Sequence, residues 1–234
     1  MSGDWLALKL ILVMRTTNFI LEKSLILCLF LGIALSASAK KREVFTVKQG
    51  DPLVILQEKK SAVFEIDYSK MIVTDGKDHD NDMIFREWMI AQNEDSEKWL
   101  KDWEEKDSAE CHKSFREHFN DEVKKGFKLT KLGKDYKVIL RFSSINFGKG
   151  SAAATVVTGI LFGGRGFLSP AIASGEIEVR DKTSDEVLAI LAFDDLVGEE
   201  RYTQISRIKG IFENLCEELS DFLKKYEKAQ KKKK

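Results

Sequence analysis

The densest group of potential metal ligands is the loop DHDND at residues 78–82, which has carboxylates at alternate positions. Calcium loops share this spacing, but they also need glycine at the sixth position and a bidentate glutamate at the twelfth. Those positions hold Met83 and Met89, so the sequence excludes an EF-hand and leaves at most a weak, exposed calcium site. The main role expected of Asp80 or Asp82 is to cap the helix that follows.

Zinc chemistry would have to draw on His79, Cys111, His112 and His118. On a helix, Cys111 and His118 share a face, whereas His112 points about 100° away from Cys111. The sequence has neither a C-x-x-C nor an H-E-x-x-H pairing, so surface histidines are expected instead of a metal centre. With three histidines and no G-x-S-x-G turn, no residue is nominated as a catalytic nucleophile.

A glycine pattern at residues 148–153, GKGSAA, matches G-x-G-x-x-A directly after a strongly predicted strand. A dinucleotide site also needs a helix and then a parallel strand that ends in an acidic residue about twenty residues on. The next expected strand begins near Gly175 and enters a hairpin, so no nucleotide or other cofactor is predicted.

The cysteines of the expected mature chain, Cys111 and Cys216, leave two alternatives open. An exported protein folds under oxidising conditions, in which the two could form a disulfide. Each also lies on the apolar stripe of a predicted helix, so a buried free thiol, the favoured alternative, explains both cysteines without a bond.

Residues 151–175 are unusual because Arg165 is their only charge. Gly159 and Gly163 form a G-x-x-x-G pair, the spacing that lets membrane helices approach closely. The uncharged run is shorter than the roughly 20 residues that a spanning helix needs, so a buried connection is the main expectation and membrane or partner contact the alternative. The residues expected in such a contact are Gly159, Phe162, Gly163, Arg165 and Phe167.

These residues must be positioned by an α+β domain whose elements follow in the order β-α(α)-β-β-β-α. Alternating apolar residues predict strands, and apolar residues at helical spacing predict helices. An antiparallel or mixed sheet with helices on one face is expected. The expected strands are 61–73, 135–147, 175–181 and 186–193, and the expected helices run from about 83 to 126 and from about 200 to 226. Phe64, Tyr136, Leu140, Phe212 and Leu219 are expected to share one core.

The chain ends suggest export. Residues 1–39 have the features of a signal peptide, with the apolar run SLILCLFLGIAL and a small-residue cleavage site that ends at Ala39. An extended, β-like arm is expected at 40–60, one α+β domain at 61–226 with a Gly/Ala-rich insertion at 148–175, and a basic tail at 227–234. The 38 basic and 38 acidic residues balance, which argues against nucleic acid as a partner.

Two sequence strings and one spacing carry a resemblance to a known family. The strings are KKSAVFEIDYSKMIV at 59–73 and GEIEVRDKTSDEVLA at 175–189, and the spacing is that of four aromatic residues on a predicted helix, Trp99, Trp103, Phe115 and Phe119. In these features the chain resembles hypothetical exported proteins of the bacterial envelope. More distantly, the order of elements is similar to the TolB amino-terminal domain and the core of the curli secretion channel subunit. The resemblance implies an α+β fold and a periplasmic or outer-membrane-associated location, and it implies no catalytic residues.

Together these features predict an exported envelope protein that acts as a non-catalytic binding or assembly module. The alternatives are a subunit of a membrane complex that uses residues 151–175, or a small metal-dependent enzyme. Partners are expected among envelope proteins or at a membrane surface, and the sequence leaves the oligomeric state open. If a membrane is contacted, residues 151–175 and the lysines after Leu223 are expected to act together.

Overall fold

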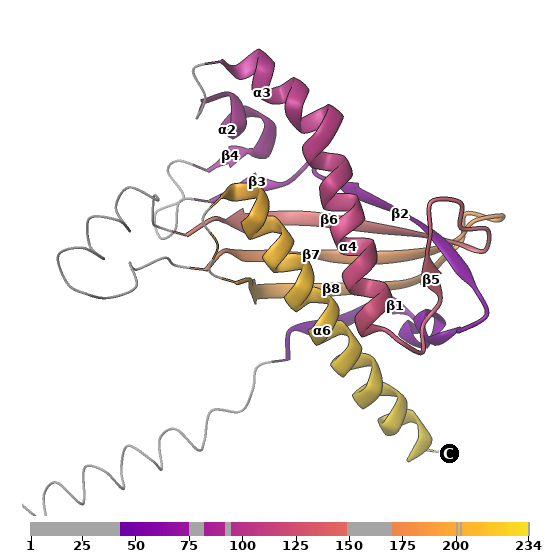
Figure 1. Ribbon diagram of the computed structural model, residues 1–234. Coiled ribbons are helices and arrows are strands. Elements are labelled where there is room, and N and C mark those ends of the chain that lie inside the picture. The colour runs from indigo at the N-terminus through magenta and orange to yellow at the C-terminus, as the bar shows by residue number, and fades with distance from the viewer. Residues whose placement is uncertain are drawn as a thin grey trace, which may run out of the picture. The chain divides into compact units, whose positions relative to one another are not determined.

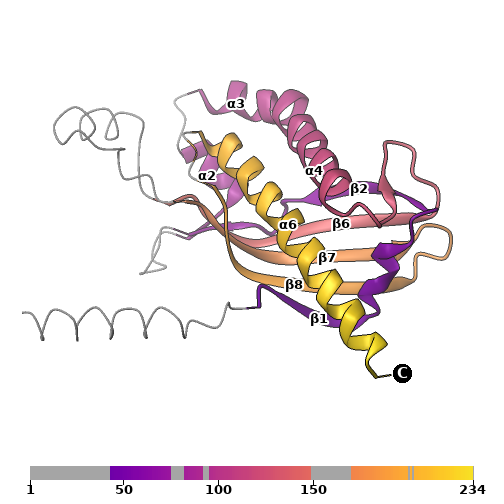
Figure 2. The same cartoon turned by 60° about the horizontal axis from the view of Figure 1, so that its bottom comes forward.

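The fold is a mixed eight-stranded sheet with its long helices on one face (Figures 1 and 2). It is seen in a computed structural model that describes residues 43–74, 82–91, 95–148, 170–199, 201 and 203–233. One compact unit, Val44–Lys234, contains all the strands and helices discussed below. The predicted α+β class is confirmed.

The strands are β1 Phe45–Gly50, β2 Ser61–Asp67, β3 Ile72–Val73, β4 Met83–Ile84, β5 Lys128–Leu129, β6 Tyr136–Asn146, β7 Ile172–Asp181 and β8 Val187–Val197. Their order across the sheet is β1-β8-β7-β6-β2-β5, and β3 joins β4 to the far end of β6. Strands β1, β8, β7 and β6 are antiparallel neighbours, whereas β2 and β3 run parallel to β6. The predicted hairpin at 175–193 is thus the pair β7–β8.

The helices are α2 Phe85–Ala91, α3 Ser96–Asp102, a π-helical turn Trp103–Asp107, α4 Ser108–Glu122 and α6 Gln204–Lys231. Thr203 and Ser206 form a capping box that starts α6. Helices α4 and α6 lie side by side over the sheet (Figure 2), and the rings of Phe115 and Phe212 meet edge to face with centroids 5.5 Å apart. We call the sheet face beneath these helices the covered face.

The covered face holds the core that the sequence predicted. Leu140, Phe212 and Leu219 are fully buried and Tyr136 nearly so, while Phe64 is partly buried and packs against them. The Phe64 ring stacks on Phe115 of α4 with centroids 4.2 Å apart. The alternation of apolar residues in the strands and their helical spacing in α6 therefore predicted residues of the same core.

Two local expectations differ from the structure. The second part of the expected arm, Pro52–Leu56, is a 3-10 helix that begins at the Asp51 cap, and β1 belongs to the main sheet, where it pairs with β8. Helix α2 begins at Phe85, directly after β4, so neither Asp80 nor Asp82 occupies its N-cap position. Helical spacing could not reveal that Ile84 pairs with Ile72 in a short strand.

Candidate binding surface on the open face

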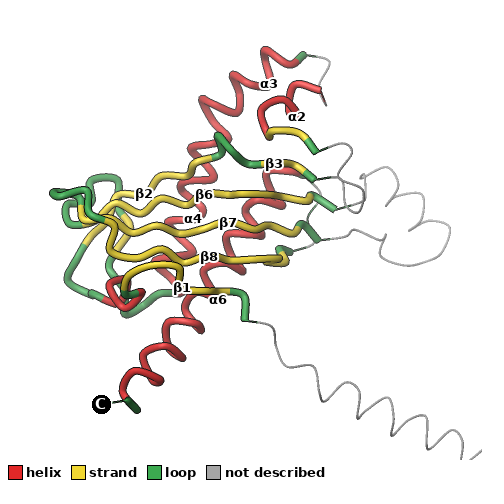
Figure 3. Tube along the Cα trace, turned by 180° about the vertical axis from the view of Figure 1, so that it is seen from behind, coloured by secondary structure: helices red, strands yellow, loops and turns green. Residues whose placement is uncertain are grey.

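The sheet face opposite the helices carries an ordered array of charged side chains. We call it the open face, because no helix of the described residues lies over it (Figure 3). It follows from strand alternation that the side chains next to buried core positions point to this face. The array, which we call the charged zone, consists of Lys48 of β1, Glu65 and Asp67 of β2, Lys137 and Arg141 of β6, and Glu176, Glu178 and Arg180 of β7.

Arg141 lies at the centre of the charged zone. Its guanidinium donates a hydrogen bond to Glu178 and is 3.5 Å from a carboxylate oxygen of Glu176. A carboxylate oxygen of Asp67 lies 3.6 Å from its Nε on the other side. The side chains of three neighbouring strands, β2, β6 and β7, are thereby tied together by one arginine.

Glu178 is the buried member of the charged zone, with 4% of its surface exposed. Arg141 and Arg180 each donate a hydrogen bond to it, one to each carboxylate oxygen. Burial alone would raise the pKa of Glu178, but these two hydrogen bonds and the two positive charges outweigh burial and lower it. The hydrogen bond with Glu178 in turn raises the pKa of Arg141.

The outer members of the charged zone are more exposed and form simpler pairs. Lys137 Nζ lies 2.9 Å from Glu65 Oε2, and Lys48 Nζ lies 3.5 Å from Glu176 Oε2. More than half of the Lys48 and Glu65 side-chain surfaces is exposed. These residues are the accessible rim, at which a partner would first meet the charged zone.

The charged zone also covers apolar side chains. Ile139 is 8% exposed and Ala192 is 6% exposed, although both belong to the open face. By register, Ile139 lies between Glu65 of β2 and Glu178 of β7. The stems of long charged side chains can shield apolar surface while their charged ends stay in water. The open face therefore presents four basic and four acidic groups that are joined to one another by ion pairs.

Such an array is suited to recognition. Exposed charges held in place by neighbours lose little conformational freedom when a partner binds, and their pattern selects a surface of complementary pattern. The alternation of Lys137 and Arg141 with the core residues of β6 was visible in the sequence. The sequence could not show that Glu176, Glu178 and Arg180 of β7 lie beside them, because strand order is a long-range property.

A second polar feature is buried beneath the helices. The Tyr68 hydroxyl is inaccessible and has no hydrogen-bond partner of ordinary geometry. Burial and the neighbouring Cys111 thiol raise the pKa of Tyr68 well above its usual value, and burial raises that of Cys111 to about 12. A thiol kept protonated in this way is a poor nucleophile, so the structure gives no support to nucleophilic chemistry at Cys111.

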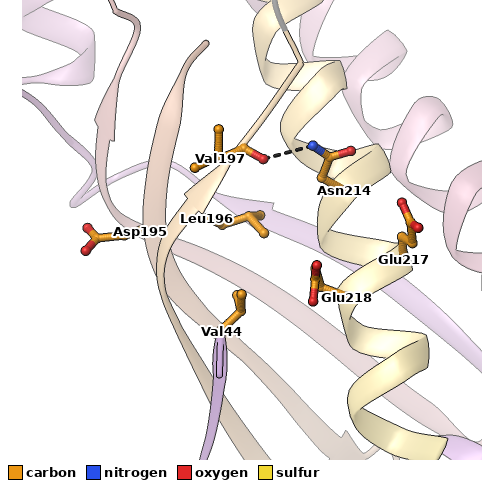
Figure 4. Close-up of a pocket in the computed structure, with 7 residues that line it drawn as sticks. All are labelled: Val44, Asp195, Leu196, Val197, Asn214, Glu217 and Glu218. Atoms are coloured by element: carbon orange, nitrogen blue, oxygen red, sulfur yellow. Dashed lines mark hydrogen bonds between the residues drawn. The ribbon is translucent and has the colours of Figure 1, made fainter. Parts of the chain in front are cut away.

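A small hollow lies between β8 and α6 (Figure 4). Within it, the Asn214 side chain donates a 2.9 Å hydrogen bond to the Val197 carbonyl. Its volume of about 240 Å³ is below the roughly 300–1,000 Å³ of most ligand pockets, and we assign it no ligand. The lining residues are Val44, Asp195, Leu196, Val197, Asn214, Glu217 and Glu218.

Much of the chemistry predicted from the sequence lies outside the described residues. This holds for the proposed contact residues Gly159, Phe162, Gly163, Arg165 and Phe167, and for most of the loop at 78–82, including His79. His112 is half-buried beside the Phe64 ring, where burial lowers its pKa. Within the described ranges, no three His, Cys, Asp or Glu side chains are arranged to hold a metal ion.

Cys111 and Cys216 are both buried and both free in the structure. Of the two alternatives that the sequence left open, the structure has the buried free thiols and not the disulfide. The described part of the chain also contains no helix that is long and apolar enough to cross a membrane.

Comparisons with known proteins give little beyond these observations. No protein-family model and no curated protein match the sequence. Two solved structures of dodecameric PelC from Paraburkholderia phytofirmans are similar at a low level. One, a variant with a single substitution, has a TM-score of 0.35 and 10% identity and covers 75% of this chain and 97% of PelC. The other has a TM-score of 0.36 and 8% identity, with coverages of 74% and 96%. We derive neither function nor assembly from them.

Proposed function

We propose that this chain is an exported protein of the bacterial cell envelope, and that it acts as a non-catalytic module that binds a protein partner on the charged zone. The observation that carries the proposal is the network of Arg141, Glu178 and Arg180 on the open face. Export is supported by the signal-peptide features of residues 1–39 and by the resemblance to envelope proteins.

The charges of the array favour a protein partner. Nucleic acid and anionic membranes attract surfaces with an excess of lysine and arginine. The charged zone instead has both signs interspersed, so its field changes sign over the distance between neighbouring strands. A folded protein surface, which also mixes both signs, can match such a pattern.

Site-specific photo-crosslinking in cells that export the protein tests the partner surface. A photoreactive amino acid at Lys137 or Glu65 should give the same discrete protein adduct, and the adduct should weaken at high salt because rim charges are screened. Lys113 of α4 is the matched control, since its side chain is 66% exposed on the helical side. Equal adducts from all three positions, or none from Lys137 and Glu65, would reject the proposed surface.

Export is tested separately. Mass spectrometry of the protein recovered from the envelope should find Lys40 at its N-terminus, because Ala37 and Ala39 occupy the small-residue positions of the cleavage site. An uncleaved chain that keeps its apolar segment would contradict this prediction and indicate a membrane-anchored protein.

A further inference from the structure

One end of the fold carries a large excess of positive charge. It is the end at which β6 begins, and three connections meet there: 57–60 before β2, 123–135 between α4 and β6, and 182–186 between β7 and β8. These connections and the last turns of α6, residues 224–233, hold fourteen lysines and five acidic residues, although the whole chain has no net charge. We call these four segments the basic end.

Hydrogen bonds tie the three connections to one another. The Lys128 amide donates a 3.1 Å hydrogen bond to the Lys60 carbonyl, which joins the first connection to the second. The Lys182 ammonium donates a 2.6 Å hydrogen bond to the Gly133 carbonyl, which joins the second to the third. The lysines of these segments therefore belong to one continuous surface.

The last turns of α6 reach the same end from the helical side. Helices α4 and α6 run in parallel, because Lys209 pairs with Glu110 near the start of α4 and Ser220 donates a 3.0 Å hydrogen bond to the carbonyl of Glu122, where α4 ends. The lysine-rich turns after Ser220 therefore extend beyond the end of α4. Figures 1, 2 and 3 all show the C-terminus of α6 at the end of the sheet where β6 begins.

Several lysines of the basic end are not neutralised. In the charged zone, by contrast, each lysine and arginine lies beside an acidic partner. Four exposed lysines of the basic end have ammonium groups that form neither an ion pair nor a hydrogen bond with any described residue: Lys59, Lys124, Lys131 and Lys134. Their charge is available to an anionic surface.

An exposed leucine lies among these lysines. Leu132 is 83% exposed, more than any other large apolar side chain of the described residues, and Lys131 and Lys134 flank it in the turn before β6. The turn is fixed against the sheet, since a Cβ on Gly133 would lie only 2.0 Å from the carbonyl carbon of Ala62 in β2. A single exposed apolar residue needs no explanation on an ordinary surface. Here it is held in the solvent between two unpaired lysines.

A leucine surrounded by lysines fits an anionic lipid bilayer. Anionic head groups attract lysines, and an exposed apolar side chain can enter the boundary between head groups and acyl chains. A soluble polyanion would attract the lysines equally, but it offers Leu132 no apolar phase. We propose that the basic end is a membrane-docking surface, on which Leu132 inserts shallowly into an anionic bilayer and the lysines around it bind the head groups.

This contact leaves the open face free. The bilayer meets the sheet at the ends of its strands, so the strands stand steeply to the membrane and the charged zone faces sideways. A protein partner can therefore bind the charged zone while the basic end is docked. Of the joint membrane contact expected from the sequence, the proposal retains the lysines alone, because most of residues 151–175 lie outside the described ranges.

Vesicle flotation of the chain from Lys40 onward, which contains the compact unit Val44–Lys234, tests the proposal. The probe is a vesicle of phosphatidylglycerol and phosphatidylcholine. The protein should float with these vesicles at low salt, float less at high salt, and stay unbound to phosphatidylcholine alone. Lys131→Gln/Lys134→Gln should bind at least about tenfold more weakly, because two charges are removed from the lipid surface.

Lys101→Gln/Lys106→Gln is the matched control. Both side chains are well exposed, at 71% and 69%, and both precede α4, whose far end adjoins the basic end. The control has the same net charge as the test variant and should float normally. An equal loss in the two variants, or failure of the unaltered protein to float, would overturn the proposal.

A dye tests the insertion of the turn separately. Cys111 and Cys216 are buried, so an environment-sensitive dye can be attached to Leu132→Cys or Val197→Cys alone. Val197 is 47% exposed and ends β8 at the opposite end of the sheet. Anionic vesicles should raise the fluorescence at position 132 and leave position 197 unchanged. An unchanged signal at position 132 would reject insertion.

Dextran sulfate separates a bilayer from a soluble polyanion. If it binds in a manner that needs Lys131 and Lys134 while vesicles do not bind, the basic end recognises a polymer and membrane docking is rejected. Flotation and photo-crosslinking at Lys137 are scored independently, so failure of this proposal is distinguishable from failure of the proposed function.

Discussion

Neighbouring residues on β6 show how the two faces of one sheet keep water out by different means. Leu140 is fully buried on the covered face, beneath the helices. Ile139, the residue before it, is 8% exposed on the open face, where it lies between charged side chains of β2 and β7. Packed helices protect the first, whereas the stems of neighbouring charged side chains protect the second. Burial alone therefore does not reveal whether a residue belongs to a packed core.

The largest expected effect comes from emptying the covered face. Leu140→Ala should lower the free energy of unfolding by about 2 to 5 kcal/mol, because the surrounding rings and helices cannot close the cavity. Ile139→Ala should cost about 2 kcal/mol or less, because the charged stems beside it can collapse into the space. Chemical denaturation of both variants measures the difference. A Leu140→Ala effect below about half a kcal/mol would show that the strand faces are wrongly assigned.

The sequence predicted the covered face well because its signals are local. Alternation in Tyr136, Val138, Leu140 and Phe142 and the long apolar stripe of α6 are both visible in short windows. The short strands β3, β4 and β5 were missed or merged, because two residues carry no periodicity and pair only through tertiary structure. The same limit explains why Pro52–Leu56 was expected to be a strand.

The candidate surfaces were less predictable than the core. The charged zone brings together residues as distant as Lys48 and Arg180, so it depends on strand order. The sequence instead pointed to residues 151–175, most of which lie outside the described residues. That expectation stays a prediction.

A smaller effect is expected from the open face. Glu178→Gln should cost about 1.5 to 3 kcal/mol, because Arg141 and Arg180 lose a charged hydrogen-bond acceptor that is shielded from water. Glu65→Gln is the matched control on the same face. Its side chain is 55% exposed, so removing its charge should cost less than about 1 kcal/mol. Equal costs for the two variants would mean that the charged zone has no buried centre.

The pH dependence of the same variant sharpens this test. The folded-state pKa of Glu178 is lowered from the ordinary value of 4.5, so its contribution to stability is fully present above pH 4.5 and is lost as the pH falls through the folded-state pKa. The stability difference between the unaltered protein and Glu178→Gln should therefore shrink below pH 4.5. A difference that stays constant down to pH 2 would show that the carboxylate is not responsible.

The smallest effect, and the one of opposite sign, concerns a polar group on the covered side. Glu178 is buried on the open face with two donors, whereas the Tyr68 hydroxyl is buried near Phe85, Trp103 and Phe142 with no partner of ordinary geometry. An unsatisfied buried hydroxyl destabilises the folded state, so Tyr68→Phe should raise the free energy of unfolding by up to about 1 kcal/mol. Denaturation at pH 7 measures this gain. A loss of stability would instead reveal a hydrogen bond to the Cys111 thiol or to a buried water, and Cys111→Ala distinguishes these two, because only the thiol bond would make the two substitutions non-additive.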